Sequence, residues 1–170
     1  MERTKWVDRT FNFDFPTGLF PTILERLRGT AARLKELTSN LSEEDAERKP
    51  GDKWSIKEQI GHLSDLESLH EGRIDDFIDG KETLRAWDIT NSQTNNANHN
   101  DSTIKELIDK FTSKRNVFIS RLKQLSDETH ATKSLHPRLR VFMRPVDLAY
   151  FTAEHDDHHL TSIRELLPMQ

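Results

Sequence analysis

Four long stretches of the sequence repeat apolar residues at intervals of three and four, the spacing of one face of an α-helix. At Ser55 the letters SIKE match the capping box that begins a helix, and Pro168 is expected to end the last stretch. No segment alternates with period two for long enough to indicate a sheet. The pattern predicts an all-α four-helix bundle, a single domain over residues 1–170, with helices near residues 19–37, 55–80, 102–125 and 145–167.

Two connectors, residues 80–101 and 126–143, are much longer than the few residues that join neighbouring helices in a simple bundle. The first is long enough to cross the bundle, which would make the second and third helices parallel. Long connectors at one end of a rigid bundle also tend to form a pocket there. For the Asn-rich part of the first connector, a mobile surface loop is an equally good interpretation.

Composition excludes several classes of protein. The chain has 25 Lys and Arg against 29 Asp and Glu, with the basic residues scattered, so nothing indicates nucleic-acid binding. No apolar run is long enough for a membrane span, and the first 16 residues lack the apolar core of a signal peptide. The chain has no cysteine, which excludes disulfides and a cysteine nucleophile and fits a cytoplasmic protein.

Near the C-terminus the letters EHDDHH place three histidines and three acids on one helix. Successive helical residues are about 100° apart, so His155 and His159 lie one turn apart on nearly the same face as the apolar residues. We expect this pair to point toward the core, and Asp156 and Asp157 to point outward or sideways. Two imidazoles four residues apart can bind one divalent ion. His158 cannot easily join them, and His155 with His158 is a poorer alternative pair.

His62, at the edge of the apolar face of the second helix, is a candidate third ligand, and Gly61 before it allows a close approach of another segment. Three neutral imidazoles would leave a fourth position for water or substrate, as in catalytic metal sites. The alternative is that His62 is a buried, hydrogen-bonded histidine and the pair is accidental. Asp65, one turn later, could orient a ligand or accept a proton, although such acids are more often solvated.

Arg115 interrupts the apolar stripe of the third helix. We expect its stem to pack against that stripe while its charge reaches solvent. Pairing with an anionic cosubstrate is the alternative.

The sequence resembles the DinB/YfiT-like metalloenzyme superfamily over nearly the whole chain, in KWSIKEQIGHLSDLE and in HPRLR followed by VDLAYFTAEHDDHHLTSI. The resemblance implies an up-down-down-up bundle, frequent homodimers, and one divalent ion, zinc or nickel, bound by His62, His155 and His159. Members with known activity largely join a low-molecular-weight thiol to an electrophile or use it in an isomerisation.

One position departs from the family pattern. Such sequences usually have glycine a few residues after the His-Pro pair, where this chain has Arg140, so either the turn differs or the arginine has a use of its own. His136, the histidine of that pair, could lie over a pocket mouth and handle protons, but we favour a role as an anchor of the loop.

The histidine spacing predicts a mononuclear metal site, and the family resemblance implies an enzyme that activates a small thiol against a small electrophile. Asp65 or His136 would manage protons. A cosubstrate must supply the thiol because the chain has no cysteine. The alternatives are a hydrolase that uses a metal-bound water and a non-catalytic bundle with a structural metal. A structural site would be closed by a fourth protein ligand such as His158 or Asp65, whereas a catalytic site stays open to a cavity.

Overall fold

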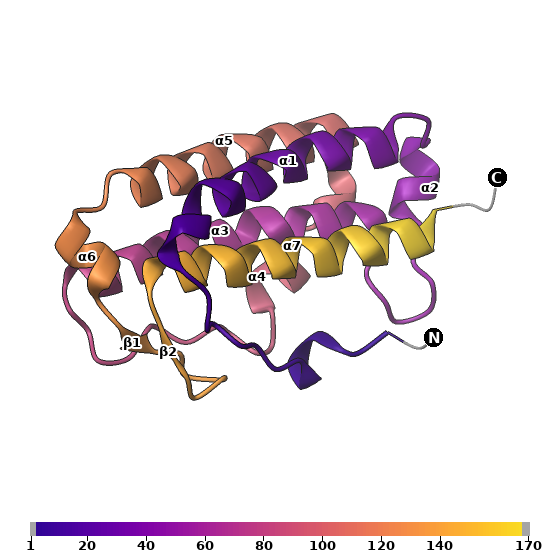
Figure 1. Cartoon of the computed structure of the whole chain (residues 1–170). Coiled ribbons are helices and arrows are strands. Elements are labelled where there is room, and N and C mark those ends of the chain that lie inside the picture. The colour runs from indigo at the N-terminus through magenta and orange to yellow at the C-terminus, as the bar shows by residue number, and fades with distance from the viewer. Residues whose placement is uncertain (1–2, 168–170) are drawn as a thin grey trace.

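The structure is a computed structural model that describes residues 3–167. Four long helices pack as a bundle (Figure 1), in which α1 and α3 each contact both α5 and α7. Their bounds lie close to the predicted ones, and Pro168 falls outside the described residues. Within these residues, no helix combines the length and the apolar character needed to cross a bilayer. The four helices are α1 (Phe20–Thr38), α3 (Ile56–Ile78), α5 (Ile104–Lys123) and α7 (Pro145–Leu166).

The four helices follow the up-down-down-up order. In Figure 1, α1 and α7 run in one direction and α3 and α5 run in the other. The connector between α3 and α5 returns along the bundle, which makes these two helices parallel, as its length allows and the family resemblance implies. The capping box is also confirmed, because the Ser55 hydroxyl accepts the Glu58 N–H at 3.1 Å and Glu58 accepts the Ser55 N–H at 2.9 Å.

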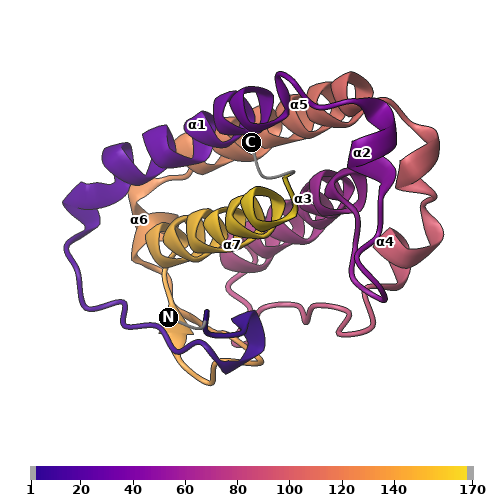
Figure 2. The same ribbon diagram turned by 90° about the vertical axis from the view of Figure 1, so that its right-hand side faces the viewer.

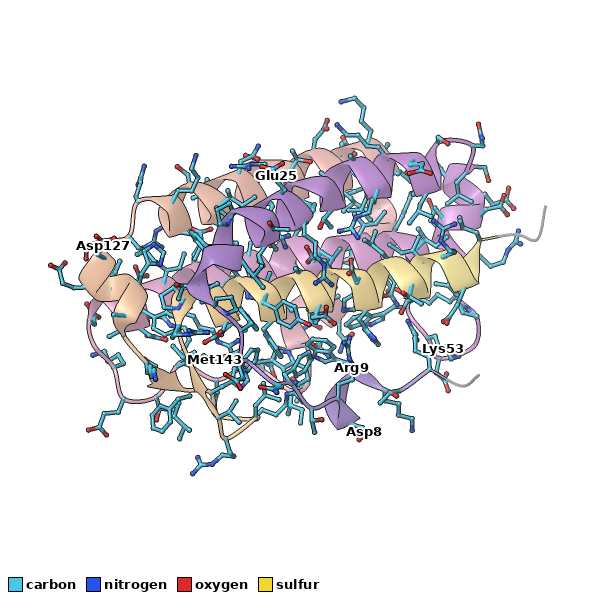
Figure 3. All side chains as sticks on the ribbon, in the orientation of Figure 1. Asp8, Arg9, Glu25, Lys53, Asp127 and Met143 are labelled. Atoms are coloured by element: carbon cyan, nitrogen blue, oxygen red, sulfur yellow. The ribbon has the colours of Figure 1, made fainter. Side chains whose placement is uncertain are left out.

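The connectors and the N-terminal segment lie along the α3–α7 side of the bundle (Figure 2). Arg9, labelled in Figure 3, ties the N-terminal segment to α7 through an ion pair with Glu154. The two antiparallel strands were not predicted, because two residues are too few to show an alternating pattern. The smaller elements are η1 (Trp6–Asp8), η2 (Thr17–Leu19), α2 (Glu43–Glu47), α4 (Ser92–Asn96), η3 (His99–Asp101), α6 (Asp127–Ala131), β1 (Ser134–Leu135) and β2 (Phe142–Met143).

A buried ion cluster divides the apolar core into two parts, and each long helix contributes one residue to it. Arg115 donates from Nε to Glu67 at 3.0 Å and from Nη2 to Asp156 at 2.9 Å. The Thr30 hydroxyl donates to Asp156 at 2.7 Å. On every helix the residue of the ion cluster stands between side chains of the two apolar clusters.

This ion cluster corrects two predictions. Asp156 does not point outward and Arg115 does not reach solvent, since their exposed fractions are 0% and 2%. Each is the partner that allows the other to be buried, because a buried charge is tolerated when it is paired and hydrogen-bonded. The residue pattern of a single helix cannot predict an ion-pair partner on a neighbouring helix.

The loop before α7 keeps a backbone conformation that suits glycine, although Arg140 occupies the position. Arg140 has a φ of 57°, and its N–H donates to the His136 carbonyl at 2.9 Å. The left-handed region costs a residue with a Cβ atom about 1–2 kcal/mol, and glycine loses part of that advantage through its freedom in the unfolded chain. We expect Arg140→Gly to raise the free energy of unfolding by about 0.5–1 kcal/mol, measured by urea denaturation.

Arg140→Ala is the matched control, because it removes the same exposed side chain but keeps the Cβ atom. It should leave the free energy of unfolding close to that of the wild type. An equal gain in both variants would show that the arginine side chain, and not the backbone conformation, is responsible.

Candidate metal centre

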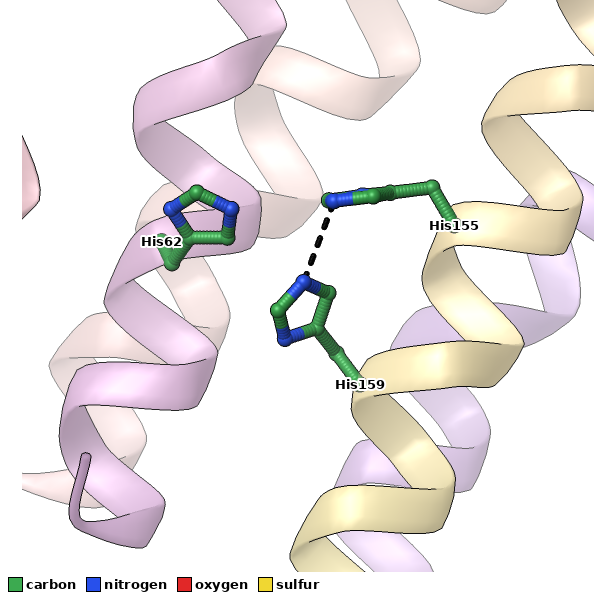
Figure 4. A group of neighbouring side chains, drawn as sticks. All are labelled: His62, His155 and His159. Atoms are coloured by element: carbon green, nitrogen blue, oxygen red, sulfur yellow. Dashed lines mark hydrogen bonds between the residues drawn. The ribbon is translucent and has the colours of Figure 1, made fainter. Parts of the chain in front are cut away.

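Three buried histidines meet between α3 and α7 (Figure 4). One ring nitrogen of His62, His155 and His159 lies within 4.8 Å of the corresponding nitrogens of the other two. The Nε2 atoms of His155 and His159 are 3.1 Å apart. The structure thus brings together the three residues that the sequence proposes as ligands, and His158 and Asp65 lie outside the group formed by the described residues.

Hydrogen bonds on the far side of two rings direct their Nε2 atoms toward this cluster. His159 Nδ1 lies 2.5 Å from the Gln59 Oε1 atom, which can only accept, so Nδ1 carries the proton. His62 Nδ1 lies 3.0 Å from the Thr94 hydroxyl, whose own hydrogen is donated to Asp65 at 3.0 Å. His62 must therefore donate from Nδ1 as well. Both rings keep the Nε2 lone pair that a metal ligand needs.

Burial keeps the three imidazoles neutral. Desolvation lowers the pKa of His62 to about 4. It also lowers the pKa values of His155 and His159 well below the ordinary value, and charge on the neighbouring imidazoles would add to the effect. Ligands at about 2.0–2.1 Å from one ion can be up to about 4.2 Å apart, so small side-chain movements would let all three share it. The three residues therefore fit a divalent metal.

Asp65 acts on the cluster from behind His62 and does not reach it. Its carboxylate accepts hydrogen bonds from the Thr94 hydroxyl at 3.0 Å and from His99 Nε2 at 2.8 Å. Burial raises the pKa of Asp65, but the hydrogen bonds from His99 and Thr94 outweigh it and leave the pKa below its ordinary value. The ionised carboxylate holds the hydroxyl that orients His62.

Three supporting residues, Gln59, Thr94 and His99, were not identified from the sequence. The one available signal was Gly61, which predicts a close approach by another segment. The ring of His99 makes that approach, since a Cβ atom on Gly61 would come within 2.3 Å of it. Thr94 and Gln59 carried no comparable signal, because an isolated threonine or glutamine is common in any connector or helix.

Two tryptophans cover the cluster from different parts of the chain. The ring of Trp54 lies 4.6 Å from that of His62, and the ring of Trp6 lies 4.9 Å from that of His155, measured between centroids. Trp6 also contacts His158, at 5.7 Å. These rings limit the access of solvent to the imidazoles from the covered side.

A partly open cavity of about 160 Å³ adjoins His155. The long connectors form a pocket, as their length suggested, but it lies along the α3–α7 side of the bundle. No carboxylate of the described residues lines it. Its walls come from the N-terminal segment, α3, the α3–α5 connector, the loop before β2 and α7, and include Trp6, Leu66, Trp87, Pro137 and Phe151.

His136 lies in the wall of this cavity and is only 2% exposed. Its Nδ1 atom accepts the Leu139 N–H at 3.2 Å, so the ring anchors the loop and its proton must be on Nε2. Within residues 3–167, Nε2 has no hydrogen-bond partner. Burial, together with the charges of Arg73 and Arg138, lowers the pKa of His136 to about 3, so the ring is neutral at neutral pH.

Comparison with known proteins gives a family and a fold. The sequence model of the DinB superfamily matches residues 26–163. No curated protein matches the sequence significantly. Among solved structures, this chain is similar to YfiT from Bacillus subtilis, which is described as a probable metal-dependent hydrolase with an unusual four-helix bundle topology. The two have a TM-score of 0.72 and 15% sequence identity, and the match covers 93% of this chain and 91% of YfiT. A mycothiol-dependent maleylpyruvate isomerase has a TM-score of 0.68 and 12% sequence identity to this chain. The match covers 91% of this chain and 63% of the isomerase chain.

Proposed function

The chain belongs to the DinB superfamily, and we propose that it is a mononuclear metal-dependent enzyme that activates a low-molecular-weight thiol for transfer to a small electrophile. The observation that carries this proposal is the group of three buried, neutral imidazoles beside a cavity, with no fourth protein ligand among the described residues. The family resemblance also supports zinc or nickel as the ion and a homodimer as the assembly.

The open geometry favours catalysis over a structural metal. A structural site is closed by four protein ligands, whereas catalytic sites have three and keep one position for substrate or water. His155, which would be one of the ligands, also lines the cavity, so a molecule in the cavity would have access to the ion. A divalent ion there would lower the pKa of a bound thiol or water toward neutrality.

The cavity walls favour a thiol over water as the nucleophile. A thiol has an ordinary pKa of about 8.5, whereas that of water is about 15.7, so the thiol needs a much smaller shift to ionise at neutral pH. Hydrolysis would gain from a carboxylate base close to the reacting water, and no described carboxylate lines the cavity. Hydrolysis remains the second candidate because YfiT, which shares the fold, is described as a probable metal-dependent hydrolase.

Asp65 and His136 receive different roles in this proposal. Asp65 is a positioning residue, because it acts on His62 through the Thr94 hydroxyl. His136 would donate a hydrogen bond from Nε2 to the substrate, since the other ring nitrogen is occupied by the Leu139 N–H. Neither role needs the residue to bind the ion.

The proposal is tested by the consumption of thiol in the presence of an electrophile. Protein loaded with zinc or with nickel would be mixed with 1-chloro-2,4-dinitrobenzene and, in turn, cysteine, glutathione, mycothiol or coenzyme A. We expect turnover above the uncatalysed rate with at least one thiol, lost on chelation and in His155→Ala, and retained in His158→Ala. Turnover of p-nitrophenyl acetate without any thiol would support the hydrolase instead. The absence of both activities would reject the enzyme in favour of a binding module.

A further inference from the structure

The cavity beside His155 contains an arginine with no acidic partner. Arg73 is 2% exposed, and the one hydrogen bond of its guanidinium within the described residues runs from Nε to the Arg85 carbonyl at 3.2 Å. The carboxylate of Asp76 is already bound by the main-chain N–H, Nε and Nη2 of Arg85, at 2.8–3.0 Å. Arg73 thus carries a buried positive charge that the described protein groups leave without an ion pair.

Arg115 is a buried arginine with a structural role, and it provides a comparison for Arg73. It is also 2% exposed, but it pairs with two carboxylates in the buried ion cluster. Burial lowers the pKa of Arg73 to about 10, whereas the paired carboxylates raise the pKa of Arg115 in spite of its burial. An unpaired buried charge costs stability, and such a cost is common at binding sites.

Two further donors line the same cavity. Arg138 donates from Nη1 to the Val7 carbonyl at 3.1 Å, but its buried Nη2 atom has no partner among the described residues. The Nε2–H of His136 is also buried and without a partner there. Both arginines are close enough to His136 to lower its pKa. Three donors, two of them charged, therefore surround a cavity that no described carboxylate lines.

We propose that the cavity binds a small carboxylate with an apolar body, held by Arg73, Arg138 and the Nε2–H of His136. This inference rests on the proposed function, because the carboxylate would belong to the electrophilic substrate. Arginine is well suited to the task, since its planar guanidinium matches the geometry of a carboxylate. The cavity holds about 160 Å³, and a cavity of about 150 Å³ in another protein is known to admit benzene. The aromatic walls formed by Trp6, Trp87 and Phe151 suit a body of that size.

The direction of the ligand follows from the position of Arg73 on α3. Arg73 lies three turns after His62, which is roughly 16 Å of helix. The carboxylate would therefore bind at the end of the cavity away from His62, and the rest of the molecule would extend toward His155. This places the reacting part of the substrate, and not its charged group, beside the candidate metal ligands.

Binding of sodium benzoate tests the proposal, with benzyl alcohol and acetate as controls at constant ionic strength. Isothermal titration calorimetry should give an affinity for benzoate at least about tenfold higher than for benzyl alcohol, which lacks the charge. Acetate, which lacks the apolar body, should bind at least about tenfold more weakly than benzoate. Equal affinities for benzoate and benzyl alcohol, or no binding of benzoate, would overturn the proposal.

Variants locate the site. Arg73→Met keeps the apolar stem and removes the charge, and Arg138→Gln keeps a polar group. Each should weaken benzoate binding at least about tenfold, while Arg140→Gln, an exposed position on the same loop, should leave it unchanged. Arg73→Met should also have a Tm no lower than that of the wild type. A lower Tm with unchanged benzoate binding would mean that Arg73 is structural. If Arg73→Met fails to fold, Arg138→Gln decides the question by the same criterion.

The same titration on the metal-free His159→Ala variant separates this inference from the proposed function. If benzoate binding depends on the arginines, but the wild type holds no metal and shows no turnover, the enzyme is rejected and the carboxylate site is kept. Turnover with no preference for benzoate over benzyl alcohol would keep the enzyme and reject the site.

Discussion

Replacing His159 by alanine is expected to reduce the metal content of the purified protein from about one divalent ion per chain to almost none. Three ligands are the minimum for a tight mononuclear site of this type, and His159 is the one whose Nε2 atom lies 3.1 Å from that of His155. The remaining pair, His62 and His155, comes from two different helices. Elemental analysis by mass spectrometry, on protein purified without added ions and dialysed, measures the loss directly.

Two further variants test whether the loss of metal is specific to the three histidines and their hydrogen-bond partners. His158→Ala removes the adjacent imidazole, which lies outside the cluster, and should keep the full metal content. Thr94→Val removes the hydroxyl that orients His62, and we expect it to weaken metal binding by roughly 10–100-fold. Circular dichroism confirms the fold of each variant. A His159→Ala protein that folds and still retains one ion per chain would show that the ion is bound elsewhere.

The fold was predictable because its signals are local. Apolar spacing, the capping box at Ser55 and the position of Pro145 are properties of short segments, and they locate the four long helices. The length of one connector allowed the parallel arrangement of α3 and α5, and the family resemblance implied it. Strands β1 and β2 were beyond such reasoning, because each has only two residues and is held by the other.

The residues of the candidate site were predictable where a local pattern or the family motif marks them, as for His155, His159 and His62. The spacing of His155 and His159 is a local property of α7, and it indicated a common direction for both rings. Thr94 and His99 reach the site through the α3–α5 connector, and their partner Asp65 lies 29 and 34 positions earlier in the chain. No periodicity relates residues across such a connector, so their part in the site becomes visible only in the folded chain.

Asp156 marks the limit of reasoning from one helix. Its angle from His155 suggested an outward or sideways direction, yet the helix is enclosed by neighbours on more of its surface than a single apolar stripe suggests. Arg115 on α5 and Thr30 on α1 make that burial possible. The same holds for the cavity arginines, because nothing in the sequence distinguishes Arg73 and Arg138. Among the described residues they lack the carboxylate partners that the buried Arg115 has.

Arg115→Met should destabilise the protein by about 3–5 kcal/mol at neutral pH. The change removes the one cation of the buried ion cluster and leaves Glu67 and Asp156, each 0% exposed, without it. A buried charge that has lost its partner keeps its desolvation cost and loses the attraction that offset it. Urea denaturation measures the change in the free energy of unfolding.

The loss should depend on pH in a definite direction. Burial raises the pKa of Glu67, and the charge and hydrogen bonds of Arg115 oppose that rise. Without Arg115 the pKa of Glu67 in the folded state rises further above its unfolded value. A group of this kind favours the folded state below its unfolded pKa, and that contribution is lost as pH rises through the folded pKa. The deficit relative to the wild type should therefore be smaller at acid pH than at neutral pH.

Two comparisons decide whether the loss comes from unpaired charge. Arg121→Met removes an arginine from the same helix whose ion pair with Asp75 is partly exposed to solvent, and it should cost at most about 1 kcal/mol. The triple variant Arg115→Met, Glu67→Leu, Asp156→Leu removes all the charge and should recover most of the stability, because apolar side chains can replace a buried ion cluster. If the triple variant is less stable than Arg115→Met alone, the four helices depend on the hydrogen bonds of this ion cluster and not merely on the balance of its charges.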